Sequence, residues 1–348
     1  MSVGIAGLGW VTPLGTDLEN VRGQIEAGIV PETKTLTNPE TGRIHRFFAT
    51  PPSAVAAVSK NPRLRRSSTI SLLAVTAGLA AIEHAGGNVA PERTAVVFAI
   101  SDGGVLYTRK FYDQIVKQGA HAASPMLFPE TVYNAPASHL AALLGLDGAS
   151  YTLVGDSSVG LTALHFATEL LETSSDLDQV VVVGAEECDW ILCEACATWR
   201  LASTPLAEGA AALVLQREGR WKLRTHPGAP FFKQREASAA LARVLRSCGA
   251  LAAVPRDEAS RRQPATRASQ LQRAIVSANG TFIDRAEAAA LAAHFPNIPI
   301  LAPKKSLGES PGASALQQVI LAALTAQPAL VTVIGFNHQA GAVLVEPA

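Results

Sequence analysis

The sequence predicts an α/β protein in which helices cover sheets of buried strands. Hydrophobic residues make up 48% of the 348 residues and aromatic residues only 5%, so the expected core consists of aliphatic side chains. Short runs of β-branched residues alternate along the chain with longer alanine-rich segments, which is typical of buried strands followed by helices. No stretch reaches the ~20 apolar residues that a membrane-spanning helix requires.

Strands and helices follow from two different spacings of the apolar residues. Short continuous apolar runs predict strands at Val3–Gly7, Ala95–Ile100, Tyr151–Val154, Gln179–Val183, Ala211–Leu215, Arg273–Ala278, Val331–Ile334 and Ala342–Val345. Apolar residues that recur every three or four positions predict helices at Leu18–Ala27, Ser67–Ala85, Ala135–Leu144, Gly160–Leu171, Arg285–Ala293 and Gly312–Leu324.

The chain is expected to divide into two halves, residues 1–217 and 218–348. The least regular stretch, 218–235, contains Pro227 and Pro230, and strands alternate with helices on both sides of it. Because no charged linker joins the halves, we expect them to pack tightly against each other.

Charge and cysteine content exclude several classes of protein. The 29 basic and 29 acidic residues give a net charge of zero, which argues against a nucleic-acid-binding surface; Arg63, Arg65 and Arg66 form only a local patch. Four cysteines provide no disulfide framework, and the amino terminus lacks the charged region of a signal peptide. We therefore expect a soluble cytoplasmic protein with no membrane or nucleic-acid partner. The low charged fraction, 17%, indicates that part of its surface is buried between subunits.

Six segments, in order, resemble the β-ketoacyl synthases, the condensing enzymes of fatty-acid and polyketide assembly. They are Val3–Gly15, Ser124-Pro125 with Asn134-Ala135, Glu208–Leu215, Asn279-Gly280-Thr281 with Glu287, Lys304–Ser314, and Gly335-Phe336. The resemblance covers nearly the whole chain, although residues 218–270 match poorly. It implies the thiolase-like fold, a five-layered α-β-α-β-α sandwich built from two similar halves. It also implies a dimer in which the strands next to the nucleophile pair across the interface.

The three reactive groups of that family are replaced in this chain. The family's nucleophile is a cysteine at a helix N-terminus in a Cys-x-x-Gly pattern, and Gly160 places Ser157 at that position. The family's His-Gly-Thr motif begins here with Asn279, and its Lys-x-x-x-Gly-His motif ends with Glu309, while Lys304 is retained.

These replacements remove most of the chemistry of condensation. A helix N-terminus lowers the pKa of a thiol from about 8.5, but a serine hydroxyl is a far weaker acid and needs a partner base. Each positioned acid–base group contributes roughly 10²–10⁴ in rate. Independent ketosynthase activity is therefore not expected.

Two further interpretations of Ser157 are open at this point. The simpler one is that Ser157 and Ser158 only cap the following helix, as serines commonly do. The other is a serine-dependent acyltransferase or thioesterase, with Glu309 as base and Asn279 as oxyanion donor. The Gly-x-Ser-x-Gly hydrolase pattern fails by one position, because Val159 stands where the second glycine belongs.

Other motifs have simpler explanations than a functional one. Cys188, Cys193 and Cys196 have a spacing that could hold zinc or supply a relocated nucleophile, but no fourth ligand lies nearby in the sequence, and buried free thiols are common in cytosolic cores. His338 is either structural or a substituted catalytic imidazole. Gly7-Leu8-Gly9 lacks the third glycine and the acidic residue of a dinucleotide-binding loop. No metal ion or cofactor is expected.

The resemblance implies a role for a chain that keeps the scaffold and lacks the reactive groups. Such chains occur as the chain-length factor of type II polyketide synthases, which pairs with a catalytic ketosynthase subunit and shapes its acyl tunnel. In this chain, Phe128, Thr131, Tyr133 and Asn134 stand where related synthases have a segment that borders the partner's acyl tunnel. Phe336 stands where they have a gating loop. We therefore expect a heterodimer with a catalytic ketosynthase and an acyl carrier protein as a further partner. A homodimeric protein that holds acyl groups without chemistry is a third possibility.

Overall fold

The computed structural model describes residues 3–247 and 271–348. Within them, one mixed sheet of 11 strands consists of two groups of five strands and one short extra strand, and a separate sheet has three strands. The first group has the order β1 (Gly4–Val11), β8 (Gly209–Gln216), β6 (Gln179–Glu186), β4 (Thr94–Ile100) and β5 (Ser150–Val154). β4 runs parallel to β5 and β6, whereas β8 is antiparallel to both of its neighbours, β6 and β1.

The second group has the order β12 (Ile300–Leu301), β11 (Arg273–Ile275), β13 (Ala329–Ile334), β14 (Gln339–Pro347) and β9 (Trp221–Arg224). The short strand β10 (Ala229–Pro230) pairs with β14. β9 is antiparallel to β14 and also to the first residues of β1, so it links the two groups of strands. The division at 217 and 218 therefore lies just before a strand that pairs with both groups, and it stays a prediction.

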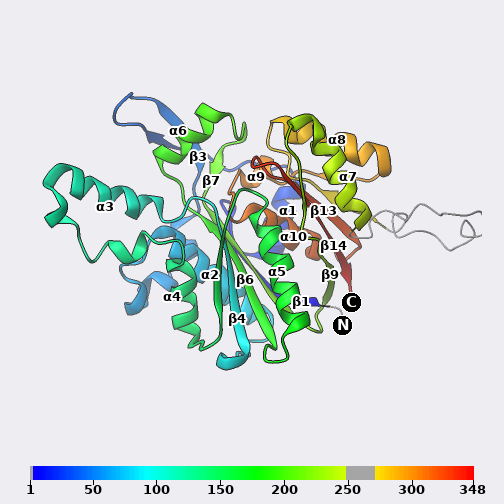
Figure 1. The fold of residues 1–348 in the computed structure, drawn as a ribbon, viewed down its shortest axis with the longest axis horizontal. Coiled ribbons are helices and arrows are strands. Elements are labelled where there is room, and N and C mark those ends of the chain that lie inside the picture. The colour runs from blue at the N-terminus through cyan, green and yellow to red at the C-terminus, as the bar shows by residue number, and fades with distance from the viewer. Residues whose placement is uncertain (1–2, 248–270) are drawn as a thin grey trace, which may run out of the picture.

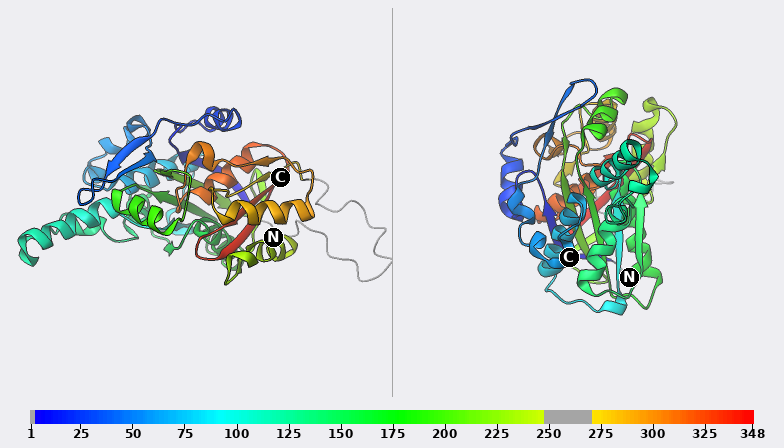
Figure 2. Two further views of the ribbon diagram at one scale, coloured as in Figure 1. Left: turned by 90° about the horizontal axis from the view of Figure 1, so that it is seen from above. Right: turned by 90° about the vertical axis from the view of Figure 1, so that its left-hand side faces the viewer.

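Helices complete five layers (Figures 1 and 2). α2 (Thr69–His84) and α4 (Ala135–Leu144) cover the outer face of the first group of strands, while α7 (Ala237–Ser247) and α8 (Phe282–His294) cover the outer face of the second. α5 (Val159–Thr173) and α10 (Ser314–Leu324) lie between the groups and contact strands of both. The expected α-β-α-β-α sandwich is confirmed.

Three large clusters of aliphatic side chains hold the layers together. One lies around α5 and α10, one under α2, and one under α7 and α8. β4 and β6 are buried along their whole length, which is why their sequences are continuous apolar runs instead of alternating ones.

The first strand is longer than the sequence predicted, because its glycines belong to the strand. A Cβ at Gly7 would lie 2.1 Å from the carbonyl oxygen of Ala81, and one at Gly9 would lie 2.3 Å from that of Ala77. Gly7 and Gly9 therefore allow the α2 backbone to pack directly on β1.

Several elements were not predicted. They are the helices α3 (Val105–Gln118), α6 (Trp190–Trp199), α7 and α9 (Lys304–Leu307), the hairpin of β2 (Lys34–Thr37) and β3 (Ile44–Phe48), β7 (Leu206–Ala207), β9, β10 and β12. α6 is apolar on most of its surface and so carries no clear helical stripe. α3 is amphipathic, with Phe111 and Ile115, and Tyr112 and Val116, spaced by four residues, although none of its residues is buried. The predicted helix at Leu18–Ala27 is present as α1 (Leu18–Glu26), which packs against α10.

Short 3₁₀ turns connect these elements. They lie at Pro52–Val55, Val58–Lys60, Pro62–Leu64, Pro91–Arg93, Ala120–Ala122, Phe128–Glu130 and Gln234–Glu236. Among the described residues, no helix is both long enough and apolar enough to cross a bilayer.

Candidate functional site

The three replaced positions meet in one buried cluster with Lys304. Ser157 Oγ donates a hydrogen bond to Glu309 Oε1 at 3.0 Å, and Asn279 Nδ2 donates to Glu309 Oε2, also at 3.0 Å. Lys304 Nζ donates to Oε1 at 2.9 Å and to Oε2 at 2.7 Å. All four residues are at most 2% exposed.

Each member of the cluster stands at the end of a regular element. Ser157 precedes α5, and Asn279 lies between β11 and α8, where Thr281 Oγ1 donates to Asn279 Oδ1 at 2.6 Å. Lys304 opens α9, and Glu309 follows Gly308, whose φ of +78° reverses the chain after that helix. Tight turns of this kind bring Lys304 and Glu309 together over five residues.

The cluster has little capacity for nucleophilic catalysis. A carboxylate offers about four lone-pair positions, and Glu309 receives four hydrogen bonds. Transferring the Ser157 proton to Glu309 would move the negative charge from the carboxylate, which Lys304 pairs with directly, to an alkoxide on Ser157. A serine hydroxyl is a far weaker acid than a carboxylic acid, so this step is strongly unfavourable. Neither a thiol nor an imidazole belongs to the cluster.

The simple capping interpretation of Ser157 and Ser158 is wrong. Ser158 occupies the N-cap position of α5 but makes no side-chain capping bond, because its hydroxyl donates to Asp156 Oδ1 at 2.7 Å. The Ser157 hydroxyl donates its hydrogen bond to Glu309. The Ser157 hydroxyl therefore bonds a distant segment, the Ser158 hydroxyl bonds a residue two positions earlier, and the helix end has no side-chain cap.

Asp156 was missed by the sequence analysis, and it fixes the β13–β14 turn against the start of α5. Its Oδ2 accepts the backbone N–H of Asn337 at 2.6 Å, and its Oδ1 accepts that of Ser158 at 2.9 Å. A Cβ at Gly335 would lie 2.1 Å from Asp156 Oδ2, so only glycine fits there. The side chain of Phe336, in the same turn, is half-buried.

His338 belongs to an aromatic contact outside this cluster. Its ring stacks on Phe231 with a centroid distance of 5.0 Å and meets Phe282 edge-on at 6.4 Å. This packing supports the structural interpretation of His338, since its aromatic neighbours offer no proton to transfer.

The cavities beside the cluster do not include its reactive positions. A pocket of about 510 Å³ is lined by residues that include Val154, Cys196, Trp199 and Phe336. A second pocket of about 250 Å³ adjoins Val154 and Asp156. The lining residues of these two pockets include none of the four cluster residues, so the cluster is closed towards both.

The three cysteines lie in a small apolar cluster with Phe47 and Leu206. Burial raises the pKa of the Cys193 thiol to about 11 and that of Cys196 to about 12, and it also raises the pKa of Cys188 well above its ordinary value. These groups are protonated at neutral pH and therefore poor nucleophiles and poor metal ligands. Within residues 3–247 and 271–348, no His, Cys, Asp and Glu side chains are grouped as a metal site would require.

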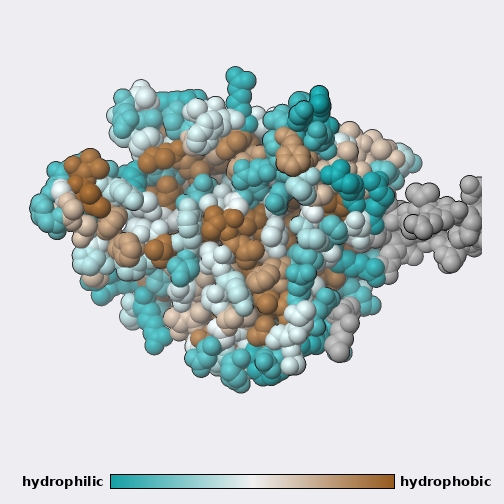
Figure 3. Space-filling view, viewed as in Figure 1, coloured by the Kyte–Doolittle hydropathy of each residue, from teal (hydrophilic) through white to brown (hydrophobic). Residues whose placement is uncertain are grey.

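The expected tunnel and interface residues reach one face of the molecule. Phe128 is 54% exposed and Tyr133 is 48% exposed, Asn134 is exposed, and Thr131 is half-buried with its hydroxyl bonded to the Phe128 carbonyl. Further large apolar residues are exposed on α3, α6 and the edge strand β5. Figure 3 shows hydrophobic patches over α3, over α6 and near the middle of this face.

Comparison with known proteins identifies the family. A family model described as "Beta-ketoacyl synthase, N-terminal domain" matches residues 2–220. The chain belongs to the β-ketoacyl synthase family. Within it, no curated protein matches the sequence significantly.

Solved structures share the fold of this β-ketoacyl synthase family member over its full length. The ishigamide ketosynthase/chain length factor is 20% identical, with a TM-score of 0.77 and coverage of 100% of this chain and 99% of that chain. A β-ketoacyl synthase from Burkholderia phymatum STM815 is 16% identical, with a TM-score of 0.79 and the same coverage. The ketosynthase ApeO in complex with its chain length factor ApeC, from Xenorhabdus doucetiae, is 16% identical, with a TM-score of 0.76 and coverage of 100% and 98%.

Proposed function

We propose that this chain is a catalytically degenerate ketosynthase-like subunit, a chain-length factor, that pairs with a catalytic β-ketoacyl synthase and shapes its acyl tunnel. The product class would be that of type II polyketide or polyene assembly. An acyl carrier protein would deliver the growing chain to the catalytic subunit.

The observation that carries this proposal is the closed Lys304–Glu309 ion pair with Ser157 and Asn279. It fills the space around the position of the family's nucleophile with charge-paired, fully bonded groups. A carboxylate bonded on four sides supplies neither an acyl acceptor nor a base for decarboxylation. The chain keeps the fold and would act through its surface.

That surface has the features of a subunit interface. β5 ends the first group of strands, so its second backbone edge pairs with no strand of residues 3–247 and 271–348, and such an edge is a template for another strand. Val154 on this strand is 55% exposed and Tyr151 is 38% exposed. Exposed Phe128 and Tyr133 would reach the partner from the loop before α4.

The test is complex formation with a cysteine-bearing ketosynthase encoded beside this chain. Co-expression should give a one-to-one complex, as measured by light scattering. Val154→Lys should raise the dissociation constant of this complex at least about tenfold, because a charge would be buried at the strand edge. Ile29→Lys, on the exposed segment after α1, is the matched control and should leave the affinity unchanged. Equal affinities for the two variants, or a stable homodimer with no mixed complex, would contradict the proposal.

One observation favours an alternative, a serine-dependent acyltransferase or thioesterase. Ser157 Oγ donates to a carboxylate at 3.0 Å, which is the contact a serine makes with a general base. Incubation of the isolated chain with acyl carrier thioesters, followed by intact mass measurement, tests it. An acyl adduct that Ser157→Ala removes would support the alternative, and an unmodified mass supports the subunit proposal.

A further inference from the structure

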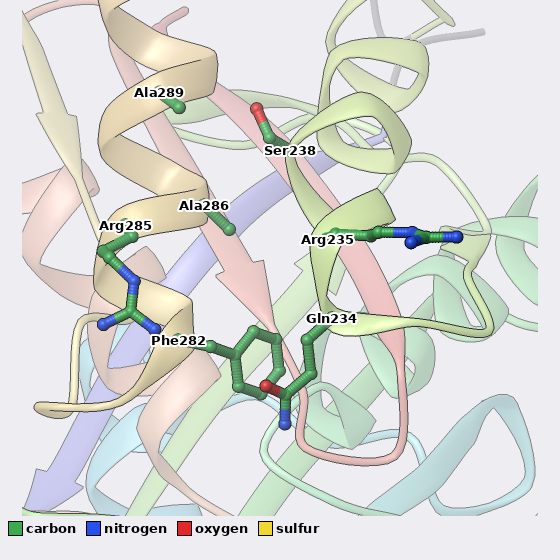
Figure 4. A pocket seen from close by; sticks show the side chains of 7 residues that line it. All are labelled: Gln234, Arg235, Ser238, Phe282, Arg285, Ala286 and Ala289. Atoms are coloured by element: carbon green, nitrogen blue, oxygen red, sulfur yellow. The ribbon is translucent and has the colours of Figure 1, made fainter.

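A second surface, on the opposite half of the fold, has the form of a docking groove. It is an open pocket of about 410 Å³ between α7 and α8, lined by residues that include Arg235, Ser238, Phe282, Arg285 and Ala289 (Figure 4). We call it the α7–α8 groove. It is distinct from the Ser157 cluster and from the face around β5, since none of its lining residues belongs to either.

The groove combines an apolar floor with two arginines. Phe282, Ala286 and Ala289 provide the apolar surface, and Figure 4 shows Arg235 and Arg285 extending to opposite sides of it. Both guanidinium groups are exposed, and no hydrogen bond or ion pair joins either of them to another side chain in the parts of the chain that the structure describes. Their charges are therefore available to a partner.

The neighbourhood of the groove is positively charged. Residues 233–247 and the first turn of α8 together contain five basic and two acidic residues. The basic residues are Lys233, Arg235, Arg243, Arg246 and Arg285. Both acidic groups are already engaged. Glu236 accepts the backbone N–H groups of Phe232 and Lys233, and these bonds, together with the nearby charges of Lys233 and Arg235, lower its pKa. Asp284 accepts the N–H groups of Asn279 and Gly280.

A further exposed apolar residue stands three positions before Arg235 in the sequence. Phe232 is 86% exposed, although an unpartnered phenylalanine gains free energy by leaving water. The whole chain carries as many acidic as basic residues, so the positive charge is local and not that of a nucleic-acid-binding protein. An amphipathic partner would match these features, which are the apolar floor of the groove, its two arginines and the exposed phenylalanine.

We propose that the α7–α8 groove binds an acidic amphipathic helix of a partner protein. Apolar side chains of that helix would lie on Phe282, Ala286 and Ala289, as in other helix-in-groove contacts. Carboxylates on its two sides would bond to Arg235 and Arg285, whose planar guanidinium groups match carboxylate geometry. The proposal goes beyond the assigned subunit role and does not depend on it.

The experiment uses the full-length chain and a fluorescein-labelled helical peptide with Leu and Phe on one face and Glu on both flanks. Fluorescence anisotropy should show saturable binding that weakens with added salt. The double variant Arg235→Glu with Arg285→Glu should bind at least about tenfold more weakly. The control is the double variant Arg46→Glu with Arg65→Glu, two exposed charge reversals outside the groove with the same total change in charge, and it should bind as the unmodified chain does.

A second pair of variants tests the apolar floor. Ala289→Trp would fill the groove with an indole ring and should weaken binding at least about fivefold, whereas Ala288→Trp, on the same helix but outside the groove, should not. Both alanines are exposed, so both variants are expected to fold, and thermal unfolding checks this.

Three results would overturn the proposal. The first is the absence of saturable binding, and the second is an equal loss for the groove variants and their controls. The third is tighter binding of a peptide with the same composition but no apolar face, or of a DNA duplex, since either would show that only net charge is recognised.

Discussion

At the scale of single residues, the charges of Glu309 and Lys304 are stable in the protein interior only because the two side chains form an ion pair. Lys304 Nζ lies within hydrogen-bond distance of both carboxylate oxygens, and both side chains are almost fully buried. A buried ion pair contributes little net stability, yet removing one partner leaves an isolated charge at a large cost.

Replacing Lys304 by methionine should therefore lower the free energy of unfolding by about 3–5 kcal/mol, as measured by urea denaturation. Adding Glu309→Gln to that variant should recover much of the loss, because the remaining amide carries no charge. Lys305→Met is the matched control, since Lys305 is the exposed neighbour in the same helix, and it should change stability by less than about 0.5 kcal/mol. An effect below about 1 kcal/mol for Lys304→Met would show that the pair is hydrated.

At the scale of secondary-structure elements, buried carboxylates join the ends of helices and loops. Glu187, directly after β6, accepts the N–H of Ile70 in the first turn of α2 and that of Leu106 in the first turn of α3. Its neighbour Glu186 accepts N–H groups of Ser101, Asp102 and Gly312. One pair of side chains thus ties α2, α3 and the segment before α10 to the end of a single strand.

Burial has a consequence for pH dependence. It raises the pKa of Glu187 to about 7 and that of Glu287, which accepts bonds from Ser277 and Thr332, also to about 7. In the unfolded chain both titrate near 4.5. Between those values each of these two carboxyl groups binds more protons in the folded protein than in the unfolded one, so its contribution to stability falls as the pH rises from about 5 to 8.

Glu187→Gln should reduce this slope of unfolding free energy against pH, leaving the part due to Glu287. The variant should also be less stable at pH 5 by about 1–3 kcal/mol, because an amide nitrogen cannot accept the second backbone N–H. Urea denaturation at several pH values measures both effects, and Glu172→Gln, on the exposed side of α5, should change neither. An unchanged slope would mean that Glu187 is ionised at no cost.

At the scale of the whole molecule, the layers approach closely where glycines replace side chains. Gly184 of β6 faces the segment before α10, where a Cβ would lie 2.1 Å from the Gly312 carbonyl oxygen. In the central layer, a Cβ at Gly160 of α5 would lie 3.0 Å from that of Ala315 in α10. The spacing between the first group of strands and the central helices therefore depends on these positions.

Gly184→Ala should lower the free energy of unfolding by about 3 kcal/mol or more, at or above the usual range for an overpacked core. Gly23→Ala in α1 is the matched control, because no atom lies within 4 Å of the added Cβ and alanine is the better helix former. It should be neutral or stabilising by up to about 1 kcal/mol in the same urea titration. Similar stabilities for the two variants would indicate that the layers move apart without strain.

The family pattern found the members of the buried cluster but not the way they interact. Ser157, Asn279, Lys304 and Glu309 were identified from motif spacing, and the structure adds that one carboxylate binds the other three. Asp156 and Glu187 were not found, because an acidic residue next to a strand or helix in the sequence gives no sign of which distant N–H groups it will meet. α3 was missed although Phe111 and Ile115, and Tyr112 and Val116, have the four-residue spacing of an amphipathic helix.

The sequence alone determined the order of the long core strands and of six helices, the fold, and the loss of the thiol and imidazole groups, since these depend on local periodicity and on residue identity at recognisable motifs. The tertiary structure decided that Glu309 is charge-paired and sealed, that β5 is an unpaired edge, and that Arg235 and Arg285 flank an open groove. Such properties arise from contacts and exposure between segments far apart in the chain. Whether a side chain is buried or paired depends on which distant segments pack against it, and a local pattern of residues does not encode that.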